Sequence, residues 1–249
     1  MLEILLLAVA GFASGLLNAV AGGGTFISLP ALLHAGIPPV SANATATLTA
    51  LPGYVSSAWA LRREMQAEGR LGLRLIIAVA AAGSVIGAIL LVLTPGEAFL
   101  WIVPWLLLLA TVLFAAGPYL LRSVQARGGL EAGPVLSAIA ILAVSIYGGY
   151  FNGGLGIMLL AAFGLLGYVN LHGMNGLKNL LSAVLSLVSV LTFIGAGLIA
   201  WEQAFVMAGA ATLGGYIGAR KSRKIVRTDL LRYFVTGVGI IMTCVFFLK

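Results

Sequence analysis

Charged side chains are scarce in this sequence. Asp, Glu, Lys and Arg together make up 8% of its 249 residues, whereas an ordinary soluble domain carries about 25%. Hydrophobic residues make up 61%, and they form repeated runs of the length that crosses a bilayer, about 20 residues. The composition excludes a water-soluble protein and predicts an all-α integral membrane protein with about 8–10 membrane segments.

Cysteine and histidine are also nearly absent. The one cysteine, Cys244, cannot form an internal disulfide, and together with His34 and His172 it cannot build a cysteine-rich zinc site. His34 stands near the end of run 25–36 and His172 at the start of run 172–199, positions typical of interfacial or capping residues. We therefore predict no metal site and no cofactor.

Acidic residues are missing from the interior of every apolar run. All seven lie in loops or at the ends of runs: Glu3, Glu64, Glu68, Glu97, Glu131, Glu202 and Asp229. Without a deep carboxylate, neither a cation site nor a carboxylate proton relay is expected. The sequence also lacks a phosphate-binding loop and a paired nucleophile and base, so it predicts neither a nucleotide-driven pump nor an enzyme with catalytic residues.

Ten apolar runs, bounded by charges, Pro and Gly, make up most of the chain. They lie at 2–21, 25–36, 40–61, 71–94, 98–121, 133–151, 155–169, 172–199, 202–219 and 229–248. The first run has Glu3 as its only charge and no basic residues before it, so it is interpreted as a membrane segment rather than a cleaved signal peptide. No long linker interrupts the series, which indicates one membrane domain, 1–249.

The two halves of this domain resemble each other. A shift of 132 positions superimposes identical residues at seven places: Gly22 on Gly154, Gly24 on Gly156, Leu33 on Leu165, Asn43 on Asn175, Leu48 on Leu180, Ser57 on Ser189, and Gly83 on Gly215. The GxxxG pairs Gly83/Gly87 and Gly214/Gly218 also correspond approximately, and such pairs allow close helix packing. We predict two repeats, 1–122 and 133–249, joined by a loop at 123–132; the competing interpretation is coincidence in a sequence rich in Gly and Leu.

Basic residues predict how the halves are oriented. Twelve of the 14 Lys and Arg lie in or beside three loops, so the net charge of +7 is interpreted as a cytoplasmic signal rather than a nucleic-acid surface. If all three loops are cytoplasmic, helices 40–61 and 172–199 cross in opposite directions, as in an inverted-topology repeat. The segment pairs 2–36 and 133–169 then each return to their starting side, either as a re-entrant hairpin or as two crossings, and both termini lie outside. Each repeat is thus predicted to be such a pair followed by three transmembrane helices. If a pair crosses only once, a parallel arrangement of the halves follows instead.

A glycine cluster interrupts each of these two segment pairs. The first cluster is Gly22, Gly23 and Gly24, followed by Thr25; the second is Asn152, Gly153, Gly154 and Gly156. Three consecutive Gly residues destabilise a helix, and an unwound point at membrane depth is tolerated where it lines a polar cavity. A helix that begins after such a break directs N–H groups and the positive end of its dipole at an anion. The alternative is that Gly only serves close helix packing.

Polar residues gather near the same two breaks. All six Asn residues lie in the broken pairs or at the start of the next helix: Asn18, Asn43, Asn152, Asn170, Asn175 and Asn179. We select Asn43, Thr47, Asn175 and Asn179 as candidate anion-binding residues, although such amides also link or cap helices. Lys178 is the only basic residue well inside an apolar run. It either supplies a positive charge to the site or extends to the interface.

In these motifs, and over nearly its whole length, the chain resembles the TauE/SafE sulfite exporter family. The resemblance rests on AGGGTFISLPALLHAGIPPVSANATATL in the first half and on its weaker counterpart GGLGIMLLAAFGLLGYVNLHGMNGLKNLLSA, which lacks an equivalent of Pro30. It implies a multi-pass protein of the bacterial inner membrane. It also implies transport of sulfite or an organosulfonate such as sulfoacetate, often outward.

The sequence therefore leads to one main hypothesis and two alternatives. The main hypothesis is a secondary transporter in the lipid bilayer for a small anionic substrate, bound between the two halves. The alternatives are an importer of another small organic anion and a membrane scaffold that transports nothing. We predict no nucleic-acid partner, and the architecture is compatible with a homodimer.

Overall fold

The computed structural model describes residues 2–20, 22–63, 65, 71–126, 133–168, 170–222 and 228–247. These residues form ten helices and no strand: α1 (Leu2–Val20), α2 (Thr25–His34), α3 (Pro39–Ala60), α4 (Leu73–Leu93), α5 (Gly96–Ala126), α6 (Pro134–Tyr150), α7 (Leu155–Leu165), α8 (Leu171–Gly195), α9 (Trp201–Ser222) and α10 (Thr228–Phe247). Each predicted apolar run thus forms one helix, and the prediction of an all-α chain is confirmed.

Four stretches in the described part of the chain are long and apolar enough to cross a membrane. They are Leu2–Val20, Leu73–Leu93, Gly96–Leu113 and Gly173–Gly195. Helices α3 and α9 have 22 residues each, but α3 is rich in Ser, Thr and Asn and α9 ends in basic residues. The two shortest helices are α2 and α7, with 10 and 11 residues. This architecture is that of an integral membrane protein.

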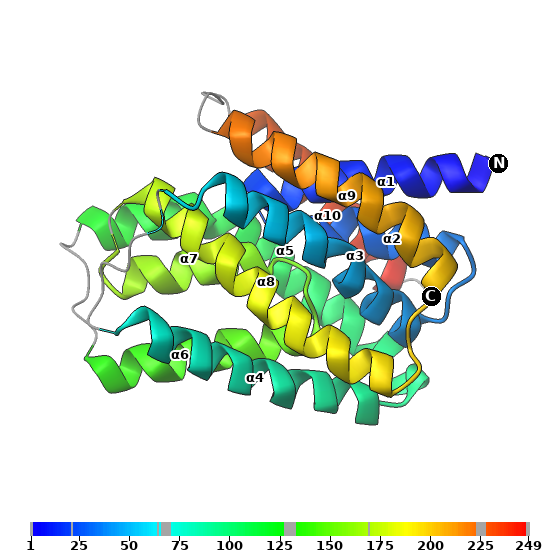
Figure 1. Cartoon of the computed structure of the whole chain (residues 1–249), viewed down its shortest axis with the longest axis horizontal. Helices are drawn as coiled ribbons and strands as arrows, with labels where there is room; N and C mark the ends of the chain where they lie inside the picture. The colour runs from blue at the N-terminus through cyan, green and yellow to red at the C-terminus, as the bar shows by residue number, and fades with distance from the viewer. Residues whose placement is uncertain are drawn as a thin grey trace.

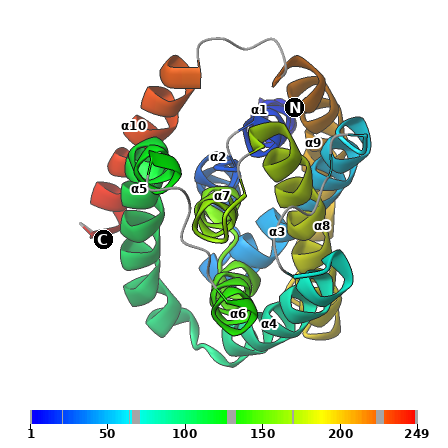
Figure 2. The ribbon, with the colours of Figure 1, turned by 90° about the vertical axis from the view of Figure 1, so that its left-hand side faces the viewer.

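Most helices run along the long axis of the molecule (Figure 1). Seen down that axis, α2 and α7 lie in the middle, with α5 and α10 on one side, α1 and α9 on another, and α4 and α6 on a third (Figure 2). Helices α3 and α8 pack against each other. In addition, α3 packs against α9, and α8 packs against α4. The short helices are therefore enclosed by the long ones.

Glycine allows the closest of these contacts. On α1, an added Cβ at Gly15 would lie 2.8 Å from the Cα of Ala211 on α9. On α4, an added Cβ at Gly83 would lie 2.7 Å from the Cβ of Ser145 on α6. The GxxxG glycines of α4 face α6, and those of α9 face α1, so they pack helices closely as the sequence predicted.

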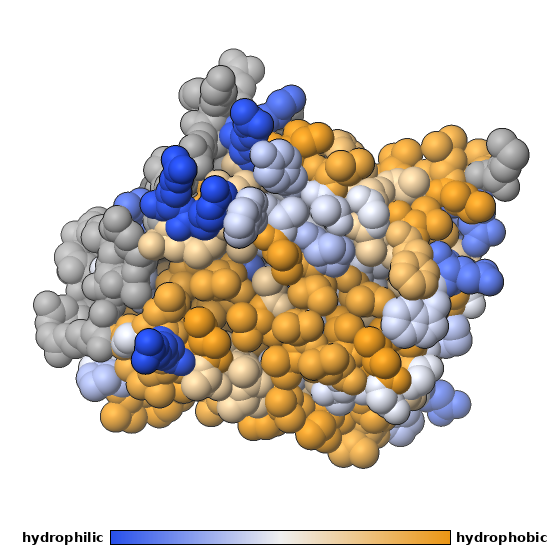
Figure 3. Space-filling model, in the orientation of Figure 1, coloured by the Kyte–Doolittle hydropathy of each residue, from blue (hydrophilic) through white to orange (hydrophobic). Residues whose placement is uncertain are grey.

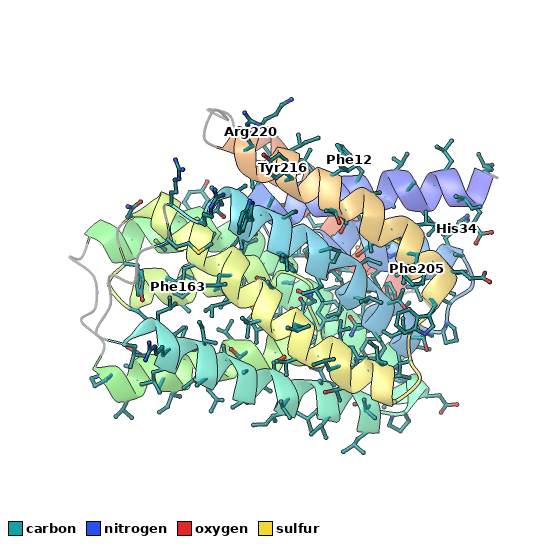
Figure 4. The ribbon with its side chains drawn as sticks, in the orientation of Figure 1. Phe12, His34, Phe163, Phe205, Tyr216 and Arg220 are labelled. Carbon is teal, nitrogen blue, oxygen red and sulfur yellow. The ribbon has the colours of Figure 1, made fainter. Side chains whose placement is uncertain are left out.

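The helix contacts are nearly preserved when α1–α5 are exchanged with α6–α10. The packed pairs that correspond are α1·α9 with α6·α4, α3·α9 with α8·α4, α1·α2 with α6·α7, α5·α7 with α10·α2, α2·α3 with α7·α8, and α1·α3 with α6·α8. The pairs α3·α8 and α5·α10 each map onto themselves. Helix α1 begins at one end of the molecule, and α2 ends at that same end, near His34. Helix α6 begins at the opposite end, and α7 ends there, near Phe163 (Figures 1 and 4).

Charge separates these two ends. Helix α9 ends in Arg220 and Lys221, at the end of the molecule where α3 also finishes and α4 begins (Figures 1 and 4). Acidic residues occupy the first turns of α1, α5 and α9, and those turns lie at the opposite end (Figure 1). Hydrophobic side chains dominate the visible surface between the two ends (Figure 3). This distribution matches a molecule that spans a bilayer along its long axis.

The close contact between α1 and α9 predicts the effect of adding one methyl group. Gly15→Ala places its Cβ against the backbone of Ala211, and overpacking of this kind costs about 1–3 kcal/mol. We expect a lower melting temperature for the detergent-purified protein. Gly209→Ala is the control, because Gly209 lies on α9 with nothing within 4 Å of an added Cβ. Equal melting temperatures for the two variants would contradict this account of the contact.

Candidate functional site

Both predicted helix breaks are present. Helix α1 ends at Val20 and α2 begins at Thr25, with Gly22 between them at φ +82°. Helix α6 ends at Tyr150 and α7 begins at Leu155, after Gly154 at φ +74°. Residues with a side chain rarely adopt such positive φ angles, so glycine at both positions is what allows the chain to reverse direction within a few residues.

The two breaks touch each other. An added Cβ at Gly22 would lie 2.5 Å from the Cα of Gly156, and an added Cβ at Gly156 would lie 2.6 Å from the Cα of Gly22. No side chain fits between the two backbones at this point. The structure therefore brings the glycine clusters of the two halves into one place.

Lys178 lies beside this contact and is fully buried. Its Nζ donates hydrogen bonds to the carbonyl oxygens of Asn18, at 3.1 Å, and Ala19, at 3.4 Å. Both carbonyls belong to the last turn of α1, where the helix dipole is negative and a cation is favoured. Extension of this side chain to the interface, the alternative that the sequence left open, is wrong because Lys178 is fully buried and its Nζ is held by these two carbonyls.

The polar side chains around Lys178 reinforce the first break. Asn179 donates from Nδ2 to the carbonyl of Asn175 at 2.9 Å and to that of Ala19 at 3.5 Å. Asn18 accepts a hydrogen bond at Oδ1 from the N–H of Gly24, at 2.7 Å. The N–H of Gly24 is therefore already engaged, so the start of α2 offers fewer N–H groups to an anion than the sequence predicted.

Asn43 bonds to the second break rather than to the group around Lys178, and Thr47 lies one turn later on α3. Asn43 donates from Nδ2 to the carbonyl of Tyr150, the last residue of α6, at 2.9 Å, and Thr47 bonds to the carbonyl of Asn43 on its own helix at 3.0 Å. The beginning of α3 thus caps the end of α6, as the beginning of α8 caps the end of α1. The structure divides the predicted residues between two related positions.

Asn152 joins the second break to the crossing of α3 and α8. Its Oδ1 accepts a hydrogen bond from the hydroxyl of Tyr54 on α3 at 3.3 Å, and its Nδ2 donates to the hydroxyl of Ser186 on α8 at 3.1 Å. All three side chains are buried. Tyr54 and Ser186 were not among the predicted site residues, although the same shift of 132 positions pairs them and could have drawn attention to both.

Several buried polar atoms in this region have no hydrogen-bond partner. They are Nδ2 of Asn18, Oγ1 of Thr25, Oγ of Ser182, and the Oδ1 atoms of Asn43, Asn175 and Asn179. Buried polar groups are nearly always hydrogen-bonded, so these atoms retain donor and acceptor capacity that the surrounding protein does not use. Among the described residues, no group of His, Cys, Asp and Glu could hold a metal ion.

Known proteins resemble this chain over almost its full length. The model of the family described as sulfite exporter TauE/SafE matches residues 7–246. A "Probable membrane transporter protein YfcA" of Escherichia coli strain K12 is 31% identical over 91% of this chain and 86% of its own length. A "Probable membrane transporter protein" of Haemophilus influenzae is 30% identical over 94% and 90%, and "Probable membrane transporter protein ORF9" of Sinorhizobium sp. is 29% identical over 90% and 86%.

These relatives are named as transporters and not as enzymes. The match spans both helix breaks and the helices that cap them. The chain is therefore an integral membrane protein that belongs to the sulfite exporter TauE/SafE family.

Proposed function

We propose that this protein is a secondary transporter that moves a small sulfur-containing anion, sulfite or an organosulfonate such as sulfoacetate, out of the cell. The family match supports transport and the sulfite class. The observation that carries the choice of an anion is a fully buried Lys178 beside two touching helix breaks. No Asp or Glu is among the buried residues of the described part of the chain, so the ammonium group has no buried carboxylate to neutralise it.

The substrate would lie beside the contact between Gly22 and Gly156. Lys178 would supply positive charge, and the unpartnered Nδ2 of Asn18 and hydroxyl of Thr25 would donate hydrogen bonds. Charge-assisted hydrogen bonds are about twice as strong as neutral ones, which favours an oxyanion over a neutral solute. The unpartnered amide oxygens of Asn175 and Asn179 would accept from a protonated oxygen of the same solute.

Alternating access would come from two inverted repeats that move against each other. The exchange of helix contacts between α1–α5 and α6–α10 supports this arrangement. The pair α1–α2 begins and finishes at one end of the molecule and the pair α6–α7 at the other, which supports the arrangement as well (Figure 1). The substrate site would then lie on the axis that relates the two repeats, where α3 crosses α8.

The basic end of the molecule would face the cytoplasm. Arg220 and Lys221 at the end of α9 follow the rule that cytoplasmic ends carry the excess of Lys and Arg. In a bacterium this placement means the inner membrane, with the start of α1 and the end of α10 on the outer side.

Removing the charge of Lys178 tests the anion site. Lys178→Gln keeps a hydrogen-bond donor for the end of α1 but loses the positive charge, so we expect flux of radiolabelled sulfite or sulfoacetate in proteoliposomes to fall at least about tenfold. Lys178→Arg keeps the charge and should retain more flux than the Gln variant. Equal flux in Lys178→Gln and the wild type would remove the charge role.

An anion-binding screen, combined with the flux assay, separates transport from a scaffold role. A transporter should show a rise in melting temperature with at least one anion of a broad panel, whereas a scaffold should show no shift and no flux. Export and import are distinguished by comparing intact cells with inside-out vesicles.

The proposed orientation predicts the location of the chain's end. Alkaline phosphatase fused after residue 249 should be active in cells because the end of α10 lies outside, while green fluorescent protein fused at the same place should be dark. A second pair of fusions after Lys221, at the basic end, should show the reverse pattern. A bright fluorescent fusion after residue 249 would contradict the inverted arrangement.

A further inference from the structure

Ser182 lies between the two helix breaks on the polar face of α8. It follows Lys178 by four residues and precedes Ser186 by four, so the three side chains stack on one face of the helix. Lys178 bonds to the end of α1 at the first break, and Ser186 bonds to Asn152 at the second. Ser182 therefore lies on the face of α8 between a residue that bonds to the first break and a residue that bonds to the second.

The hydroxyl of Ser182 is fully buried and has no hydrogen-bond partner. Serine and threonine inside a helix commonly bond to the carbonyl four residues earlier, as Ser57 does to Gly53 at 2.7 Å and Thr47 does to Asn43 at 3.0 Å. Ser182 does not make this bond. An unmade hydrogen bond on a buried hydroxyl is unfavourable, which indicates a role outside the folding of α8.

Other hydroxyls on the same face of α8 take part in hydrogen bonds. Ser189 shares a hydrogen bond with Ser84 of α4 at 2.8 Å and lies 3.4 Å from the carbonyl of Gly149. Ser186 accepts from Asn152. Ser182 thus differs from its neighbours on this face in having a buried hydroxyl without a partner, midway along α8 between Lys178 and Ser186.

The first half of the chain has no counterpart to this hydroxyl. The shift of 132 positions places Ala50 opposite Ser182 and Ala46 opposite Lys178. Both alanines are buried on α3, and neither can donate a side-chain hydrogen bond. Charge and free hydroxyl are therefore combined on α8 alone.

We propose that Ser182 is a solute-binding residue that determines affinity for oxyanions. Its hydroxyl donates a hydrogen bond to an oxygen of the anion whose charge faces Lys178, and this bond supplies the partner that the hydroxyl lacks within the protein. The inference rests on the proposed anion transport and adds to it a residue that sets the affinity for the transported oxyanion.

The test compares Ser182→Ala with Ser189→Ala. Because Ser182 has no bond to lose, Ser182→Ala should leave the melting temperature of the ligand-free protein unchanged or raise it. The half-saturating sulfite or sulfoacetate concentration for flux should rise about 10- to 100-fold, as expected for a lost hydrogen bond to a charged group. Ser189→Ala should do the opposite, lowering the melting temperature with little change in half-saturation.

Each outcome has a distinct meaning. If the wild type shows neither flux nor a melting shift with any anion, the proposed function fails. If the wild type responds and Ser182→Ala responds with the same half-saturation, the proposed function stands and the role of Ser182 is refuted. A lower melting temperature for ligand-free Ser182→Ala, with unchanged affinity, would assign the hydroxyl to structure and also refute the proposal.

Discussion

A helix that stops inside a membrane protein leaves carbonyl groups that lipid cannot satisfy, and this constraint governs the centre of the structure. Helix α1 stops at Val20 and α6 at Tyr150. In both cases the beginning of a helix from the other half supplies donors: α8 through Lys178 and Asn179, and α3 through Asn43. The two halves are therefore joined by hydrogen bonds at the places where α1 and α6 end.

Glycine makes this arrangement sterically possible. The contact of Gly22 with Gly156 leaves no room for a Cβ on either residue, and the glycines of α4 and α9 bring the flanking helices to similarly close distances. Small residues at helix contacts are typical of membrane proteins, where association depends on packing rather than on the hydrophobic effect. The two breaks can therefore expose polar backbone groups and still lie in close contact, because long helices packed through glycine surround them.

The same groups serve the fold and the proposed site. Lys178 stabilises the end of α1 through its bonds to the carbonyls of Asn18 and Ala19, and an anion that binds its ammonium group would compete with these carbonyls for the same donors. Substrate binding would thus change the capping of α1 without requiring a remote signal. The corresponding position on α3 is Ala46, which has no such group, so the two halves are related in packing but differ in charge.

Much of this protein could be predicted from its sequence, because hydrophobic length and glycine act locally. Runs of apolar residues determined the ten helices, and the glycine clusters determined where α1 and α6 end, since no other residue readily adopts the φ of Gly22 or Gly154. The partners of the buried polar groups depended on tertiary structure. Only the tertiary structure turned Lys178 toward the end of α1, placed Asn43 at the end of α6, and left the hydroxyl of Ser182 buried without a partner. Those contacts join residues that lie more than a hundred positions apart in the chain or face each other across helices, and a local pattern carries no information about them.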